Sequence, residues 1–542
     1  MLGTNPEQLS DVPIANLQVP FMPRKSHDAV FNLVKSMTRS ERRYFKVLAS
    51  RSHSSDELRI VRLFDLMHGQ KNYDESVILK AEKLSAARLA TYKTRLYDYI
   101  LNGLQAFHKN NGIERKIIRL LDQIEILYQK GLYDQASALI EKAKKLAKEN
   151  GKDILLAKAI DWERHLTVYQ SSKTGHLQQN LEAVKGNSKN VLSDIEITGY
   201  LSDLYASIYK IFCQEGRVAR SATAREAIEH LIDSSFNQFQ FNTLSEAQQI
   251  KYNRALYTAY MLLGRGADSV IKAQMNRRIY EHSHNKEAIN KDDYLHANNH
   301  LIISFHQEQQ PMEALKVIEE LRTLSSRHPE FETAHYRSRI FDYTAFHELE
   351  AHIAAGNHAQ ILHILPSLEK QLHDHLHALN PVNVQSKKYR IALGYFAVGN
   401  YKDSIKCIHQ LLGQDSAAFR EDIQNSTDLL LLLNHFALGN WDVIENKVGI
   451  LIRLLDKTNR LYPPQKHLLL FLREQSLSKT ASTRKCIPAN FLKDLHLLES
   501  ESPKGVQVLS YFNVSGWLQQ FVREQQEPLV INQYQGQKAK AS

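Results

Sequence analysis

Histidines are the side chains whose number and spacing come closest to forming a chemical site. The 542-residue sequence contains 25 of them. The densest group comprises His347, His352, His358, His363, His373, His375 and His377. His347-Glu348 begins a near match to the HExxH zinc motif, but the next histidine, His352, follows after five residues instead of four, so the two rings do not share a helix face. His373 and His377 do share a face, yet a zinc site takes three or four protein ligands. We therefore expect ordinary polar-face histidines and no metal site.

The sequence also lacks the common phosphate-binding and nucleophile motifs. No GxxxxGK[ST] loop occurs, and Gly264-Arg265-Gly266 is only the start of a dinucleotide fingerprint, which a helical turn explains better. No G-x-S-x-G elbow occurs, although the members of a catalytic triad need not be neighbours in sequence. We expect no enzymatic activity and no cofactor.

Positive charge is concentrated near the N-terminus. The segment from Met22 to Asn110 carries 17 Lys/Arg against 9 Asp/Glu, whereas the formal net charge of the whole chain is +10. The candidate contacts for a nucleic acid or an acidic partner are Arg39, Arg42, Arg43, Lys46 and Arg51. A second basic group comprises Lys80, Lys83, Arg88, Lys93 and Arg95. Short helices before a long one suggest a helix-turn-helix relative that contacts phosphates. The competing interpretation is a solvated basic face that packs on the body or on an acidic partner.

The elements that would position these residues are helices. Thr38-Arg39-Ser40-Glu41 and Ser54-Ser55-Asp56-Glu57 both have capping-box spacing, which predicts two helix starts. A short helix is expected from about Asp74. Apolar residues at three- and four-residue steps predict a long helix over 86–108. The basic segment 22–112 is thus predicted to be a helical domain of three short helices and a long one.

From residue 113 onward the chain repeats a helix–turn–helix pattern. The firm turns are at Gly131, Gly356, Gly399 and Gly439, and looser ones fall at Gly175, Gly216 and Gly264; at Gln309 there is no glycine, but the pattern of the second helix is kept. Successive turns are 40–48 residues apart. Other positions that mark the repeat are Tyr133, Ala136, Tyr395, Tyr401 and Trp441. A hairpin of this kind cannot bury its apolar face alone, so the hairpins must stack on one another.

The pattern Gly131-x-Tyr133-x-x-Ala136 resembles the core of the tetratricopeptide repeat, as does Ala392-x-x-Tyr395-x-x-x-Gly399-x-Tyr401. The spacing here exceeds the usual 34 residues and is closer to that of HEAT-type repeats. The chain as a whole, with its basic helical segment 22–112 and an aromatic C-terminal segment around Trp517, also resembles a group of bacterial repeat proteins. That second resemblance implies no activity and no functional residues. The resemblance to tetratricopeptide repeats implies an all-α superhelical array, that is, an α-solenoid of about eight hairpins over 113–460.

The ends of the chain are predicted to flank this array. Pro463-Pro464 ends the pattern, and helices over 465–475, 489–498 and 515–524 would form a helical cap within 461–530. Residues 1–21 and 531–542 are expected to be a disordered leader and tail, with Met1 and Met22 both open as the start. Cys213, Cys407 and Cys486 show no paired spacing, and no apolar run is long enough to cross a membrane. These features favour a cytoplasmic protein without membrane contact.

Two hypotheses for the function follow from the architecture. The first is a non-enzymatic scaffold that binds a peptide or protein segment in the concave face lined by the first helices of the hairpins. The alternative is a regulator whose segment 22–110 binds DNA or RNA while the repeats sense a partner. Tyr395 lies on a first helix and is expected to reach the concave face, whereas Tyr401 and Trp441 are expected in the core between repeats.

Overall fold

The computed structural model describes residues 26–49, 55–71, 73–109, 112–174, 177–283, 290–375, 381–412, 421–458, 461–478, 487–501, 509 and 512–523. These residues are helical, as predicted, apart from turns and one isolated bridge between Leu509 and Phe512. The expected leader 1–21 and tail 531–542 lie outside them. None of the described helices is both long and apolar enough to span a membrane. The chain divides into two compact units, Met1–Arg119 and Leu120–Ser542.

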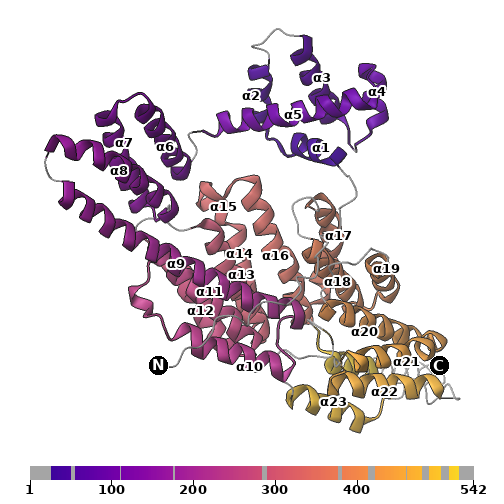
Figure 1. Ribbon diagram of the computed structural model, residues 1–542. Helices are drawn as coiled ribbons and strands as arrows, with labels where there is room; N and C mark the ends of the chain where they lie inside the picture. The colour runs from indigo at the N-terminus through magenta and orange to yellow at the C-terminus, as the bar shows by residue number, and fades with distance from the viewer. Residues whose placement is uncertain are drawn as a thin grey trace, which may run out of the picture. The chain divides into compact units, whose positions relative to one another are not determined.

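The first unit has one more short helix than the sequence predicts (Figure 1). Its helices are α1 (Ser26–Ser36), α2 (Arg39–Ala49), α3 (Ser55–Gly69), α4 (Glu75–Glu82) and α5 (Ala86–Phe107). The predicted capping box at Thr38 is confirmed, because the Thr38 N–H donates to Glu41 at 2.7 Å and the Glu41 N–H to the Thr38 hydroxyl at 3.3 Å. The apolar stripe of α5 packs into a core with Phe45 and Phe64, whose ring centres are 4.6 Å apart.

The second unit is a series of helical hairpins, each with a first helix, a turn and a second helix. Its N-terminal helices are α6 (Ile113–Gln129, which spans the unit boundary), α7 (Tyr133–Glu149), α8 (Asp153–Thr174), α9 (Leu177–Glu215) and α10 (Ala222–Leu231). The central ones are α11 (Glu246–Leu262), α12 (Gly266–His282), α13 (Lys291–Gln307), α14 (Pro311–Arg322), α16 (Ala334–Ala354) and α17 (His358–His375). The last are α18 (Pro381–Ala397), α19 (Tyr401–Leu412), α20 (Glu421–Leu438), α21 (Trp441–Lys457), α22 (Pro463–Leu477) and α23 (Ala489–Glu501).

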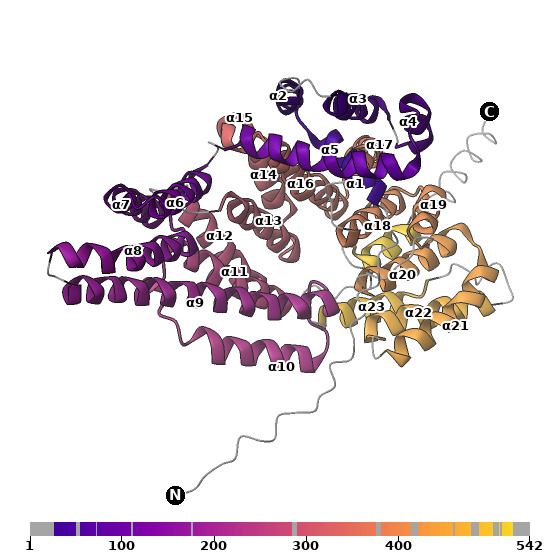
Figure 2. The same ribbon diagram turned by 45° about the horizontal axis from the view of Figure 1, so that its top comes forward.

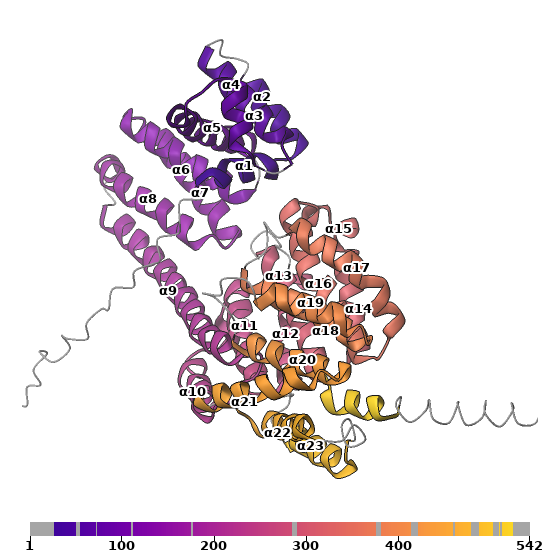
Figure 3. The ribbon, with the colours of Figure 1, turned by 90° about the vertical axis from the view of Figure 1, so that its right-hand side faces the viewer.

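Short elements complete the second unit. A π-helical turn η1 (Ile232–Phe236) continues α10, and η2 (Phe241–Thr243) precedes α11. Between α14 and α16 lie α15 (Leu324–Arg327) and η3 (Pro329–Phe331). After α23, residues 514–523 form one further helix. Figure 3 shows α20 to α23 following one another toward the C-terminus.

The predicted turns are built by left-handed residues. Gly131, Gly356, Gly399 and Gly439 all have positive φ, from 65° to 76°. After Gly399 the Asn400 N–H donates to the Tyr395 carbonyl at 2.9 Å, and the Asn440 N–H donates to the His435 carbonyl in the same way. This is the Schellman pattern, which terminates a helix by capping its last carbonyls. At the turn without a glycine, Gln309 itself adopts a φ of 56°, so the hairpin geometry is kept at the cost of a left-handed glutamine.

Helix α9 belongs to two hairpins. It is 39 residues long and ends at Glu215, directly before the predicted turn at Gly216, while the turn predicted at Gly175 lies outside the described residues. The helix packs against α8 and also against α11 (Figure 2). Its N-terminal half therefore acts as the second helix after α8, and its C-terminal half acts as the first helix before α10.

Candidate functional site

The first helices of the later hairpins contact one another in a closed circuit. Helix α9 contacts α11, and the contacts then run from α11 to α13, α16, α18 and α20. Helix α20 in turn contacts α9, which completes the circuit. Helices α9, α11, α13, α16 and α18 meet inside this circuit through a set of polar side chains, which we call the inner face. These side chains are Tyr205, Arg254, Asp293, His296, His300, His306, Tyr343, His347, Glu350 and Arg390.

Arg254 joins three helices in the first part of the inner face. Its guanidinium lies over the Tyr205 ring of α9 at 4.2 Å and donates to the Tyr205 hydroxyl at 3.1 Å. Its other terminal nitrogen is 3.6 Å from the Asp293 carboxylate of α13. Burial raises the pKa of Asp293, and the nearby Arg254 and Lys251 only partly oppose that effect. Burial alone would favour the protonated, neutral form of Asp293, and Arg254 lies where its charge favours the carboxylate.

Two neutral histidines follow on α13. His300 stacks on Tyr257 of α11 with ring centres 3.9 Å apart, and the Tyr257 hydroxyl donates to the His300 carbonyl at 3.2 Å. His296 Nδ1 is 3.0 Å from the Tyr343 hydroxyl of α16. Burial lowers the pKa of His296 to about 3, and burial also holds that of His300 well below its usual value. Both imidazoles are thus uncharged at neutral pH.

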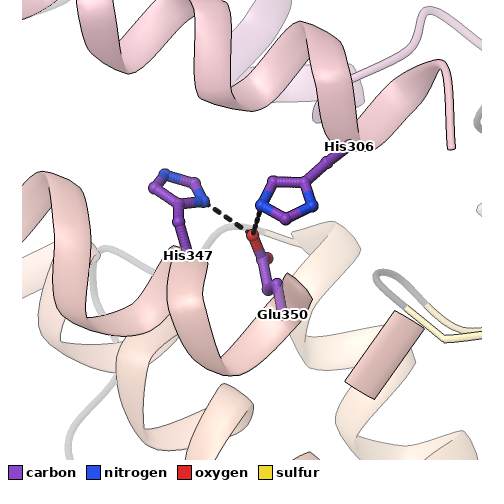
Figure 4. A group of neighbouring side chains, drawn as sticks. All are labelled: His306, His347 and Glu350. Atoms are coloured by element: carbon purple, nitrogen blue, oxygen red, sulfur yellow. Dashed lines mark hydrogen bonds and ion pairs between the residues drawn. The ribbon is translucent and has the colours of Figure 1, made fainter. Parts of the chain in front are cut away.

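Glu350 is the centre of the second part of the inner face (Figure 4). One oxygen, Oε1, is 2.9 Å from Arg390 Nε and 3.4 Å from Arg217 Nη2. The other, Oε2, is 2.7 Å from His347 Nδ1 and 3.7 Å from His306 Nε2. The Glu350 side chain is only 4% exposed, so one buried carboxylate is shared by residues of α13, α16, α18 and the connection after α9.

The charges of this group follow from its geometry. Burial alone would raise the pKa of Glu350, but Arg217, Arg390 and His347 outweigh burial and hold the pKa well below its usual range. Burial lowers the pKa of His306 to about 4 and that of His347 to about 3. At neutral pH the group therefore consists of one carboxylate, two guanidinium ions and two neutral imidazoles.

His306, His347 and Glu350 also have the residue types of a metal site. Their candidate ligand atoms lie within 4.8 Å of one another. However, Arg217 and Arg390 already neutralise the Glu350 carboxylate and leave a net positive charge in a buried place, where adding a divalent cation is costly. The arrangement fits a buried ion-pair network better than a metal centre. A second buried pair, Asp342 with Lys387, joins α16 to α18 one to two turns away.

Buried polar atoms that lack hydrogen-bond partners concentrate on the first helices. Among the described residues they include atoms of Asn253 and Arg254 on α11, Asn299, His306 and Gln307 on α13, Gln385 on α18 and Asn434 on α20. The second helices from α12 to α21 contribute fewer, with Asn276 of α12 as an example. Such groups in native proteins are normally satisfied by water or a ligand.

Two of the five basic residues predicted on or beside α2 make contacts within the first unit. Arg42 Nη1 donates to the Met37 carbonyl at 3.0 Å, and Lys46 Nζ is 2.6 Å from Asp65. Arg39 and Arg43 are exposed, and Arg51 lies outside the described residues. Lys35 Nζ donates to the His68 carbonyl at the end of α3 at 2.6 Å. Burial and then the charges of Arg42, Lys35 and Lys46 lower the pKa of His68, and Asp65 opposes them.

The remaining repeat positions are structural. Ala136 is buried, the ring centres of Tyr133 and Tyr169 are 4.6 Å apart, and Tyr401 and Trp441 pack on Phe396 and Phe436. Tyr395 does not lie among the inner-face residues. It lies beside Glu369 of the second helix α17, and burial followed by this carboxylate raises its pKa to about 12.

Sequence reasoning missed most of the inner face. Among the described side chains of the histidine cluster, His347 alone takes part, while His358, His363 and His373 are exposed; His377 lies outside the described residues. The partner of His347 is His306, which lies on another hairpin. A signal was nevertheless present, because α13 and α16 carry polar residues on every side and have no clean apolar stripe. No protein-family model matches the chain, and no curated protein matches it either.

Proposed function

We propose that this protein is a non-enzymatic cytoplasmic scaffold that binds an extended peptide or protein segment against the inner face of a tetratricopeptide-like superhelical array. The observation that carries the proposal is the concentration of buried, unpartnered hydrogen-bonding atoms on the first helices. Each such atom costs about 1–3 kcal/mol when it is left without a partner. An extended chain offers alternating N–H and C=O groups, and these can pair with amide and imidazole side chains.

Asn299 is well placed for this role. It lies one turn after His296 on α13, on the side of the helix that faces Tyr343 of α16. Its Oδ1 atom is buried and, among the described residues, has no hydrogen-bond partner. A peptide N–H that donates to this oxygen would remove a cost already present in the free protein, so the gain on binding is larger than for an exposed asparagine.

Asn299→Ala is expected to weaken peptide binding about tenfold without destabilising the free chain, because the lost acceptor makes no bond there and its removal also removes the cost of an unpaired buried oxygen. Peptides would be selected on the full-length chain from a random 12-residue display library, and their affinities measured by fluorescence anisotropy. Asn237→Ala, at an exposed position after η1, is the matched control. Equal affinities for Asn299→Ala and the wild type, or no saturable peptide at all, would contradict the proposal.

A nucleic-acid-binding first unit is the second candidate function, and the group of cations close to His68, Lys35, Arg42 and Lys46, favours it. Its sharpest test uses Arg39 and Arg43, the two exposed arginines of α2. If they contact phosphates, Arg39→Glu with Arg43→Glu should reduce the slope of log K against log salt by about 1.8 for duplex DNA. The readout is anisotropy of a labelled 20-base-pair duplex or single strand at two salt concentrations. Lys142→Glu, at an exposed position on α7, is the control. An unchanged slope would remove this candidate.

A further inference from the structure

The connection between α9 and α10, residues 216–221, reaches three distant parts of the second unit. Arg217 Nη2 is 3.4 Å from Glu350 on α16. The guanidinium of Arg220 lies 5.1 Å from the centre of the Tyr462 ring, just before α22. The Ala219 N–H donates to the Leu262 carbonyl at the end of α11 at 2.7 Å. This short segment thus holds together helices that are far apart in the sequence.

The segment has a defined shape of its own. Glu215 accepts hydrogen bonds from the Arg220 N–H at 2.9 Å, the Ser221 N–H at 3.2 Å and the Ser221 hydroxyl at 2.8 Å. Val218 and Ala219 are buried. Because Glu215 fixes the backbone locally, the segment can leave its distant contacts as one piece and return to them as one piece.

The Glu350 group is arranged so that the contact with Arg217 can be released. The Arg217 side chain is 17% exposed, against 8% for Arg390, so Arg217 lies nearer to water. When Arg217 leaves, Glu350 keeps Arg390 and His347 as partners, and no buried carboxylate is left alone. Of the two arginines, Arg217 is therefore the one whose departure costs less. The other contacts to Glu350 remain and preserve the packing of α16 on α18.

We propose that residues 216–221 form a latch on the inner face. The latch is held shut by the Arg217–Glu350 and Arg220–Tyr462 contacts, and its release controls the access of a partner segment to the first helices. This inference rests on the proposed function for the identity of what enters. The latch itself is a property of the free protein and can be tested without any partner.

The test compares the full-length wild type with Arg217→Ala and with Arg220→Ala. Hydrogen exchange of the Ala219 amide should accelerate at least tenfold in both variants. Modification of His306 and His347 by diethyl pyrocarbonate, mapped by mass spectrometry, should accelerate similarly relative to the exposed His373. Lys210→Ala, which removes an exposed charge from α9, is the control and should change neither rate. Exchange in α14 should stay constant, which separates local opening from global unfolding.

Unchanged rates at Ala219 and at both histidines in the arginine variants would overturn the latch. So would acceleration that spreads equally to α14, because that result means general destabilisation. Faster entry of the reagent together with no peptide bound by any variant would sustain the latch while removing the proposed peptide-binding function. Faster association of the selected peptides with Arg217→Ala than with the wild type would support both.

Discussion

Glu350→Gln is expected to destabilise the second unit by about 3–5 kcal/mol, because a buried ion pair that loses one partner leaves an uncompensated charge. Here the charge is doubled, since Arg217 and Arg390 both depend on the same carboxylate. Glutamine keeps the size of the side chain and one acceptor oxygen but carries no charge. The loss of stability in Glu350→Gln therefore reports the missing charge and not a change in packing volume.

The measurement is urea unfolding followed by tryptophan fluorescence. All three tryptophans, Trp162, Trp441 and Trp517, belong to the second unit, so the signal reports on the unit that contains Glu350. The matched control is Glu313→Gln, which breaks an exposed pair with Lys316 at 2.6 Å. That pair should contribute less than about 1 kcal/mol. A Glu350→Gln midpoint as close to the wild type as that of the control would show that Glu350 is not the ionised centre of the group.

Local features of the fold could be predicted from the sequence. The turns at Gly399 and Gly439 and the capping box at Thr38 are encoded within a few residues, so the pattern alone places them. The turn at Gln309 shows that stacking also imposes the geometry where the sequence offers no glycine. At each of these turns the two flanking helices pack against each other along their length. The position of the turn is therefore fixed by where the first helix ends.

Helix α9 could not be predicted because nothing in its sequence enforces continuity. A break was expected between the hairpins that turn at Gly175 and Gly216. The weak breakers in the middle of α9 are Gly186, Asn187, Asn190 and Gly199, and each costs a helix about 1 kcal/mol or less. Packing against α8 on one half and α11 on the other outweighs that cost. Two neighbouring hairpins therefore share one unbroken helix.

Some basic residues of α1 and α2 make contacts within the first unit that their sequence alone does not indicate. Arg42 and Lys35 donate to carbonyls at or near helix ends, and Lys46 pairs with Asp65. Cations are stabilised near helix C-termini by the helix dipole, so part of the positive excess serves the fold of the first unit. Composition alone cannot separate these residues from Arg39 and Arg43, which stay exposed.

The inner face depends on pairs that are distant in sequence. Arg217 and Glu350 are separated by 133 positions, and the contact arises only because the circuit of first helices closes. The latch and the binding proposal share this origin. A helix surrounded by other helices on all sides has no solvent face, so its polar side chains must find partners inside the protein.

Acidification should unfold the second unit between about pH 6.5 and 4.5, before most carboxylates are protonated. His347 is buried, His296, His300 and His306 are largely buried, and all four are neutral, with pKa values of about 3 for His296 and His347, about 4 for His306 and a lowered value for His300. In the unfolded chain each has a pKa near 6.5. Below that pH the unfolded state binds more protons than the folded state, so stability falls as the pH decreases.

The size of the effect follows from the number of protons. Each buried histidine contributes a slope of about 1.4 kcal/mol per pH unit, and four together give about 5 kcal/mol per unit. A typical domain has a total stability of about 5–15 kcal/mol. Glu350 acts in the same direction but later, because its lowered pKa means that its contribution is lost only below about pH 4.5.

Urea midpoints measured by tryptophan fluorescence at pH 7.5, 6.5, 5.5 and 5.0 would give the slope. In His347→Gln one proton is removed from the count, so the slope below pH 6.5 should fall by about a quarter even though the variant is less stable at every pH. His373→Gln, at an exposed position on α17, should leave the slope unchanged. Identical slopes for His347→Gln and the wild type would mean that His347 is not held neutral by burial. The inner face would then have to be open to water, which contradicts its burial inside the closed circuit of first helices.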